Sequence, residues 1–290
     1  MTLDQLITFL WVSRLGGVRR AAQEMNISQP AVSGRIAALE QSLGTQLFDR
    51  AQRGVTLTKK GVLLCDYAEK ILNLVEGIKA DIIPAEAEDS LLRVGVAETI
   101  VQLWLSEFLS ALYETYPKIR VEIVVDVTLN LRQQLLERTI DIALLMGPIS
   151  EYTVDNLPLP NIPLAWFKPA GRPDPDLSAT PVITYHRNSR PYREIRQQMI
   201  NRYGPGTQLF PTSSVNAGLE MVATGIGVGL FASRIAKQFV DQGRIEPFDP
   251  GWNLDDLEFT ASFLGDPRNE LCARAAEIAA ASAERYLSMT

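Results

Sequence analysis

The chain has 290 residues, 46% of them hydrophobic and 21% charged, which excludes a largely disordered protein and predicts two or three compact units. No apolar run is long enough to cross a bilayer, and the N-terminus lacks a small-residue cleavage site, so we expect a cytoplasmic protein. The net charge of −6 is uneven: residues 1–62 hold eight basic and four acidic residues (+4) and the remainder carries −10, as expected for a polyanion-binding head on an acidic body.

Three short helices are predicted at the N-terminus. Apolar residues at helical spacing begin at Leu3, and the pattern stops at the pair Gly16 and Gly17, which ends helices readily. A second helix is expected over residues 18–25. Ser28 can cap a third helix, and Pro30 is tolerated in its first turn because the missing N–H is not needed there.

The third helix has two faces of different character. Spacings of four, three and four predict an inward apolar stripe made of Val32, Ile36, Leu39 and Leu43. The opposite face begins with Gln29, Pro30, Ser33 and Gly34, flanked by Arg35. Small or hydrogen-bonding side chains suit entry into a DNA major groove, although the periodicity fits a solvated surface equally well.

The segment AAQEMNISQPAVSGRIAALEQSLGTQLFDRAQRGVTLTKKG, residues 21–61, resembles the signature of LysR-type transcriptional regulators. The resemblance implies a winged helix-turn-helix domain over residues 1–61, with RAQRGVTLTKKG as the wing. Family members commonly carry Ser or Thr where this chain has Val18, which shifts the implied phosphate contact to the two arginines that follow. They often carry a long polar residue in place of Gly34, so base preference differs there. The implied DNA contacts are Arg19, Arg20, Ser28, Gln29, Pro30, Ser33, Gly34, Arg35, Arg50, Arg53, Thr56 and Thr58.

Residues 62–89 are predicted to form a linker. A long amphipathic helix is expected from about residue 58 to 87, with an apolar stripe of Val62, Cys65, Ala68, Ile71, Leu72, Val75, Ile78 and Ile82. A stripe of this length needs a partner, and the resemblance implies the same helix of a second subunit, with homotetramers formed from such dimers. Ile83, Pro84 and the acidic residues after them indicate a hinge.

Residues 90–290 alternate between strand and helix patterns, which predicts a parallel α/β body. The resemblance implies two Rossmann-like lobes, as in periplasmic binding proteins: lobe one over about 90–163 and 264–290, and lobe two over about 164–263. The glycines of GIGVG, residues 225–229, follow a predicted helix and precede a strand. This order is the reverse of a dinucleotide-binding loop and indicates close packing of the strand against a helix.

Parallel sheets bind ligands at the carboxyl ends of their strands, which predicts an effector site between the lobes. Arginines near residue 190 would favour a ligand carboxylate at this site, or they face solvent. Glu98 on the other side of the cleft, paired with these arginines, would suit a zwitterion such as an amino acid. In related proteins the position of Glu98 is often small and neutral. The candidates are Glu98, Thr99, Ile100, Thr128, Asn130, Met146, Gly147, His186, Arg187, Ser189, Tyr192, Arg193, Ser213, Ser214 and Asn216.

Other functional classes have less support. The two cysteines, Cys65 and Cys272, are far apart, and the chain has one histidine, His186, so we expect no zinc site, cofactor or catalytic triad. A solute-binding protein or an enzyme built on a similar body would not explain the basic head, and an enzyme would need an acid-base set that is not apparent. The sequence predicts a regulator that binds double-stranded DNA under the control of a small carboxylate or amino acid.

Overall fold

The computed structural model describes residues 1–51, 54–82, 90–265 and 269–288. The chain divides into two compact units, Met1–Pro84 and Ala85–Thr290, which we call the head and the body. Within the described ranges, no helix is both long and apolar enough to span a membrane. Residues 83–89 of the predicted hinge, and the predicted contact Arg53, lie outside the described residues.

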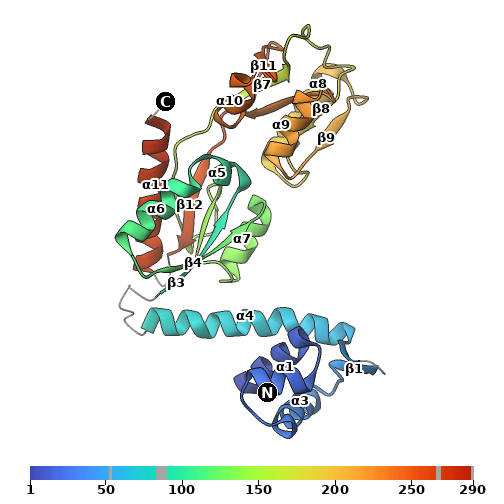
Figure 1. Cartoon of the computed structure of the whole chain (residues 1–290), viewed down its shortest axis with the longest axis vertical. Helices are drawn as coiled ribbons and strands as arrows, with labels where there is room; N and C mark the ends of the chain where they lie inside the picture. Colours follow the sequence, from blue (N-terminus) through green and yellow to red (C-terminus); the bar gives the residue numbers. More distant parts are fainter. Residues whose placement is uncertain (52–53, 83–89, 266–268, 289–290) are drawn as a thin grey trace. The chain divides into compact units, whose positions relative to one another are not determined.

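The head has the predicted order of helices and a small hairpin (Figure 1). Its elements are α1 (Leu3–Leu15), α2 (Val18–Glu24), α3 (Gln29–Leu43), β1 (Phe48–Ala51), β2 (Gly54–Leu57) and α4 (Lys59–Ile82). The Ser28 hydroxyl accepts the N–H of Ala31 at 3.3 Å, as a helix cap should. Gly16 and Gly44, with φ of 65° and 62°, end α1 and α3 in the left-handed conformation that glycine adopts without strain. The predicted helix boundaries are therefore confirmed.

Aromatic and aliphatic side chains of α1, α3 and β1 form the core of the head. Phe9 and Val32 are fully buried, and the Phe9 and Phe48 ring centroids lie 5.2 Å apart. Val32, Ile36 and Leu39 face inward as predicted, but Leu43 is 40% exposed. The prediction for Leu43 is wrong because α3 ends at this residue, beyond the surface that α1 covers.

The apolar residues of α4 divide between two faces. Ala68 is buried, and Cys65, Ile71 and Leu72 pack against the core of the head, so part of the predicted stripe is used within the chain. Another group remains about half exposed: Val62, Leu63, Tyr67, Leu74 and Ile78, with exposed fractions of 48–57%. We call this group the open face of α4.

The body contains two five-stranded sheets. The first has the order β4 (Arg120–Val125), β3 (Leu91–Val96), β5 (Ile142–Met146), β12 (Phe259–Leu264) and β6 (Val154–Pro158). The second has the order β9 (Leu209–Pro211), β8 (Val182–Thr184), β10 (Val228–Ala232), β7 (Leu164–Pro169) and β11 (Ile245–Phe248). In each sheet the first three strands are parallel, the fourth runs antiparallel to them, and the fifth pairs antiparallel with the fourth. The sheets are thus mixed, not purely parallel as predicted.

Helices cover both faces of the first sheet. They are α5 (Glu98–Leu103), α6 (Leu105–Thr115), α7 (Thr128–Leu136) and α11 (Glu270–Ser288). Successive residues of β5 belong alternately to two apolar clusters: Ile142 and Leu144 to one, Ala143 and Leu145 to the other. Figure 1 shows α6 and α11 side by side beside this sheet, with α7 on its other side. The second sheet carries α8 (Arg190–Tyr203), α9 (Val215–Ala223) and α10 (Ser233–Asp241).

The chain passes between the sheets twice, and the two connecting segments pair with each other. Ile162 and Leu257 exchange backbone hydrogen bonds of 3.0 and 2.9 Å, and the N–H of Leu159 donates to the carbonyl of Phe259 at 2.9 Å. The return to lobe one therefore begins with β12 at Phe259, before the predicted boundary near residue 264. This strand is buried over most of its length. A continuous apolar run indicates a buried strand, but it does not indicate to which of the two sheets the strand belongs.

Glycine at position 227 allows close approach of two strands. A Cβ there would lie 2.2 Å from the carbonyl oxygen of Pro181, the residue before β8. The prediction of close packing in this segment is confirmed, but the neighbour is a parallel strand and not a helix.

Candidate functional site

The start of α3 presents a slim, exposed surface. Ser28, Gln29, Pro30, Ser33 and Gly34 are all exposed, and nothing lies within 4 Å of the position that a Cβ on Gly34 would occupy. No neighbouring element therefore covers this surface within the head. Its shape and small polar side chains fit the dimensions of a DNA major groove.

The basic candidates of the head are placed differently from one another. Arg19 and Arg20 are exposed on α2, and the Arg20 guanidinium donates to the Leu15 carbonyl at 3.5 Å. Arg35 is turned toward α1, where its guanidinium lies 3.6 Å from the Asp4 carboxylate and donates to the Thr8 hydroxyl at 3.3 Å. The structure thus places Arg35 at a contact between two helices beside the exposed surface.

The predicted wing residues also differ in their surroundings. Thr56 is exposed on β2. The Thr58 hydroxyl donates to the Gln46 carbonyl at 3.0 Å and accepts an N–H from the first turn of α4 at 3.0 Å, so it caps that helix. Arg50 lies in β1, and Arg53 is outside the described residues.

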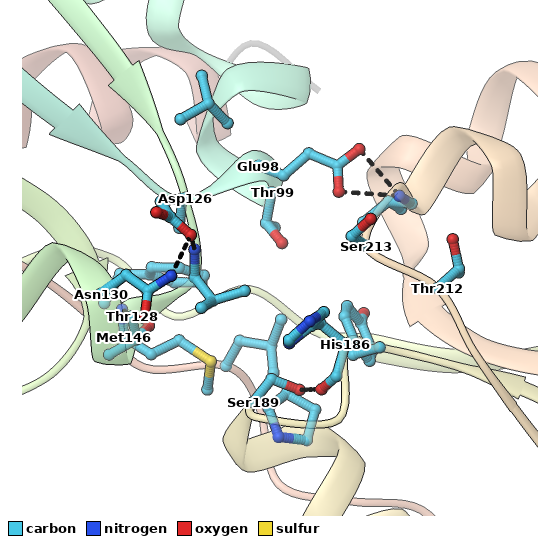
Figure 2. A pocket seen from close by; sticks show the side chains of 18 of the residues that line it. Glu98, Thr99, Asp126, Thr128, Asn130, Met146, His186, Ser189, Thr212 and Ser213 are labelled. Atoms are coloured by element: carbon cyan, nitrogen blue, oxygen red, sulfur yellow. Dashed lines mark hydrogen bonds between the residues drawn. The ribbon is translucent and has the colours of Figure 1, made fainter. Parts of the chain in front are cut away.

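A cavity of about 440 Å³ lies in the body between the carboxyl ends of the parallel strands of both sheets (Figure 2). Strands β3, β4 and β5 bring one group of residues to it, and β8, β9 and β10 bring the other. The lining residues are Ala97, Glu98, Thr99, Val125, Asp126, Val127, Thr128, Asn130, Met146, Tyr185, His186, Ser189, Pro191, Thr212, Ser213, Val215, Phe231, Leu257 and Phe259. This is the position that the topology predicts for a ligand.

Glu98 joins the two lobes across the cavity. It begins α5, beside the first sheet, and both of its carboxylate oxygens accept the N–H of Val215 at the start of α9, at 2.9 and 3.0 Å (Figure 2). Burial raises the pKa of Glu98 above its ordinary value, while the hydrogen bonds from Val215 and Ser214 oppose that increase. The carboxylate is therefore held at the positive end of a helix of the other lobe.

Asp126 occupies a similar position on lobe one. Its carboxylate accepts the N–H of Val127 at 2.7 Å and the side-chain amide of Asn130 at 2.8 Å, at the beginning of α7. Figure 2 shows Asp126, Thr128, Asn130 and Met146 on the same wall of the cavity. Two carboxylates and an amide thus contribute much of the polar lining.

His186 and Tyr185 follow β8 on the other wall. The Nδ1 atom of His186 accepts the N–H of Asn188 at 3.1 Å, which leaves Nε2 as the ring nitrogen available to another partner. The Tyr185 side chain is 8% exposed, and its hydroxyl makes no hydrogen bond of normal geometry with any described residue. Burial raises the pKa of this hydroxyl, a polar contact with the Ala232 backbone opposes the increase, and the Glu98 carboxylate adds to it.

The structure brings a large part of the predicted effector set to the cavity. These residues are Glu98, Thr99, Thr128, Asn130, Met146, His186, Ser189 and Ser213. Each lies at the end of a strand or in the first turn after it. Strand-end geometry therefore located the cavity from both lobes.

The other predicted residues do not line it. Ile100 is fully buried in the core because the first turn of α5 directs it toward the sheet. Gly147 lies beside Thr260. Arg187, Arg193 and Asn216 are exposed elsewhere, and Tyr192 and Ser214 lie in or beside the first turns of α8 and α9 without lining the cavity.

Sequence reasoning missed several lining residues, which are Val125, Asp126, Val127, Tyr185, Pro191, Thr212, Val215, Phe231, Leu257 and Phe259. Asp126 could have been found by the same strand-end reasoning, because it directly follows β4, which ends at Val125. Thr212 follows β9, a strand of three residues too short to give a clear pattern. Leu257 comes from the paired segments between the sheets, which only the tertiary fold brings to the cavity.

The melting temperature of Glu98→Gln relative to that of the wild type is expected to increase as the pH rises from 4.5 to neutrality. A raised pKa in the folded state means that ionising Glu98 opposes folding, and this effect grows as the pH rises from the ordinary value of 4.5 through the folded-state value. Thermal melts of wild type and variant from pH 4.5 to neutrality should therefore diverge as the pH rises. A variant that loses stability relative to wild type over this range would contradict the assignment.

Comparison with known proteins gives a consistent result for both units. Residues 3–62 match the family model of the bacterial regulatory helix-turn-helix protein, lysR family, and residues 85–275 match the LysR substrate binding domain. The transcriptional regulator GltR of Bacillus subtilis is 28% identical over 250 residues, covering 84% of each chain. These relatives are transcriptional regulators, not enzymes.

Solved structures show the same fold. The chain is similar to full-length CbnR complexed with its target DNA, with a TM-score of 0.71, 20% identity and coverage of 97% of this chain and 100% of that one. It is also similar to LysG from Corynebacterium glutamicum with bound effector Arg, with a TM-score of 0.58, 18% identity and coverage of 98% and 99%. The two family models together span most of the chain, which therefore belongs to the LysR family of DNA-binding transcriptional regulators with an effector-binding domain.

Proposed function

We propose that the exposed surface at the start of α3 reads the bases of an operator. Ser33 lies at the centre of this surface, and Gln29 and Pro30 precede it in the first turn. Arg19 and Arg20 on α2, with Thr56 on the wing, contact phosphates on either side. Arg50 and Arg53 belong to the same wing in this proposal. Arg35 positions α3 against α1 through Asp4 and Thr8, and Thr58 positions the start of α4.

The protein assembles as a homodimer through the open face of α4. Leu63, Tyr67, Leu74 and Ile78 are spaced by four, seven and four residues, so they form one stripe along the helix. An apolar stripe of this kind is stable in water when a second helix covers it. A second copy supplies a matching stripe, two α3 helices then address two half-sites, and two such dimers form a tetramer in the cytoplasm.

The cavity of the body binds the effector, an amino acid or another small carboxylate. Its volume and its mixture of polar and apolar walls fit a molecule of that size. The solved LysG structure with bound Arg offers a precedent for an amino acid as the effector of a protein with this fold. The observation that supports the proposal best is the bridge from Glu98 to Val215, because a ligand in contact with it acts on both lobes.

DNA recognition is tested by fluorescence anisotropy of the intact protein with labelled DNA flanking its own gene. Binding should be tighter than to scrambled DNA and should weaken with salt, since phosphate contacts release counterions. Ser33→Ala is expected to lower the specific affinity at least about fivefold, the equivalent of about 1 kcal/mol. Ser42→Ala, on the same helix but bonded to the Leu39 carbonyl, is the matched control and should leave affinity unchanged. Equal affinity for all sequences would refute base reading by α3.

A further inference from the structure

The charged side chains that line the cavity are both acidic. Glu98 and Asp126 are carboxylates, and neither Lys nor Arg is among the lining residues. The Nδ1 atom of His186, which also lines the cavity, already accepts a backbone N–H. The cavity therefore carries a negative field, which favours a cationic ligand and disfavours an anionic one.

Two helix N-termini that would attract an anion already hold a carboxylate of the protein. Glu98 accepts the N–H of Val215 at the start of α9, and Asp126 accepts the N–H of Val127 at the start of α7. Free backbone N–H groups at such positions are the usual anion sites of this kind of fold. Here an internal carboxylate already accepts one N–H at each of these positions, and its negative charge makes the position less favourable for a ligand carboxylate.

The arginines near residue 190 do not compensate for this charge. Arg190 pairs with Glu194 at 2.6 Å and with Glu258 at 3.7 Å. Arg193 donates to the Asn188 carbonyl at 3.4 Å, and Arg187 is exposed. None of them lines the cavity.

One polar group on the wall still lacks a partner. The hydroxyl of Tyr185 is buried and makes no hydrogen bond of normal geometry within the described part of the chain, a condition that usually costs free energy. Phe231 and Phe259 lie in the same lining and provide apolar contact. The cavity thus combines two carboxylates that can accept hydrogen bonds from a cation, a buried hydroxyl without a hydrogen bond of normal geometry in the described residues, and an apolar wall.

We propose that the effector of this protein carries a protonated amine, which the carboxylates of Glu98 and Asp126 recognise, and that a carboxylate on the ligand is not the group that provides affinity. The Tyr185 hydroxyl hydrogen-bonds a polar atom of the ligand, and the apolar part lies against Phe231 and Phe259. This inference rests on the proposed role of the cavity as the effector site, and it favours amines and amine-bearing amino acids over carboxylates that have no amine.

The test uses two sets of three matched compounds with the full-length protein in isothermal titration calorimetry. One set is L-leucine, 4-methylpentanoate and 3-methylbutylamine, and the other is L-phenylalanine, 3-phenylpropanoate and 2-phenylethylamine. Within a set, the compounds differ in the amine or the carboxylate. In at least one set, the amino acid and the amine should each bind at least about tenfold more tightly than the carboxylate that has no amine.

Variants connect that preference to the two carboxylates. Glu98→Gln and Asp126→Asn should each weaken amine binding at least about tenfold, whereas Glu114→Gln, which removes an exposed carboxylate of α6 outside the cavity, should not. Thermal melts of each variant show that it is folded. Binding of the carboxylates as tightly as the amines, no binding of any amine, or full affinity in both cavity variants would each overturn the proposal. Because no DNA is present, these outcomes are independent of the anisotropy result for α3.

Discussion

Replacing Tyr67 with glutamate should separate the subunits that pair through α4, reduce the mass of the assembly, and lower its affinity for operator DNA at least about 100-fold. Tyr67 lies at the centre of the open face of α4 with 57% of its surface exposed. Covering such a side chain at an interface contributes roughly 1.5–3 kcal/mol, and placing an unpaired carboxylate there costs several kcal/mol more. A head that lacks its α4 partner binds one half-site only, so the binding free energy of the second half-site is lost.

Sedimentation equilibrium measures the mass of the assembly, and anisotropy on the same samples measures DNA affinity. Tyr152→Glu is the matched control, because Tyr152 is 97% exposed and belongs to the body, whereas α4 belongs to the head. It should leave both quantities unchanged. Leu74→Glu should reproduce the effect of Tyr67→Glu, and an assembly mass equal to that of the wild type in both variants would exclude α4 as an interface.

Gly61→Ala should unfold the head selectively. Gly61 lies in the first turn of α4, and a Cβ there would lie 2.2 Å from the Leu47 carbonyl oxygen and 2.9 Å from Cδ2 of Leu57. The oxygen belongs to the backbone and accepts the Thr58 N–H at 2.9 Å, so no rotamer change relieves the clash. Forced overpacking of this kind costs about 1–3 kcal/mol or more, and DNA binding should be lost.

Gly34→Ala is the control for glycine replacement. A Cβ at Gly34 meets nothing within 4 Å, and alanine in a helix interior is favoured over glycine by about 0.5–1 kcal/mol. Chemical denaturation followed by far-ultraviolet circular dichroism should show loss of stability for Gly61→Ala and a gain for Gly34→Ala. Ligand binding to the body should survive in both, and similar loss in both variants would show that crowding at Gly61 is not the cause.

Local signals in the sequence were enough to predict the head. Gly16 and Gly44 end helices in the left-handed conformation and Ser28 caps α3, and each of these signals acts within a few residues of its position. The exception was Leu43, whose exposure depends on how far α1 extends across α3. Periodicity also predicted α4, but it did not distinguish Cys65 and Ile71, which pack on the head, from the open face.

In the body, the sequence predicted where the cavity lies better than it predicted which charged side chains line it. Strand ends predicted Glu98, Thr128 and Ser213 because parallel strands bring their carboxyl ends together. The direction of the arginine side chains could not be predicted, since Arg190 is held by Glu258 from a distant part of the chain. The bridge between Glu98 and Val215 spans 117 residues, and no local pattern encodes such a contact.

The paired segments between the sheets restrict how the lobes can move. Ile162 and Leu257 are joined by two backbone hydrogen bonds, so the connection resists twisting more than two separate chains would, and bending remains the easiest motion. Leu257 and Phe259 belong both to this hinge and to the cavity wall. A ligand that contacts these two residues therefore contacts the connection about which the lobes bend. The size of its apolar part then sets the angle between the lobes. A series of ligands of increasing apolar size would produce a graded series of transcriptional activities.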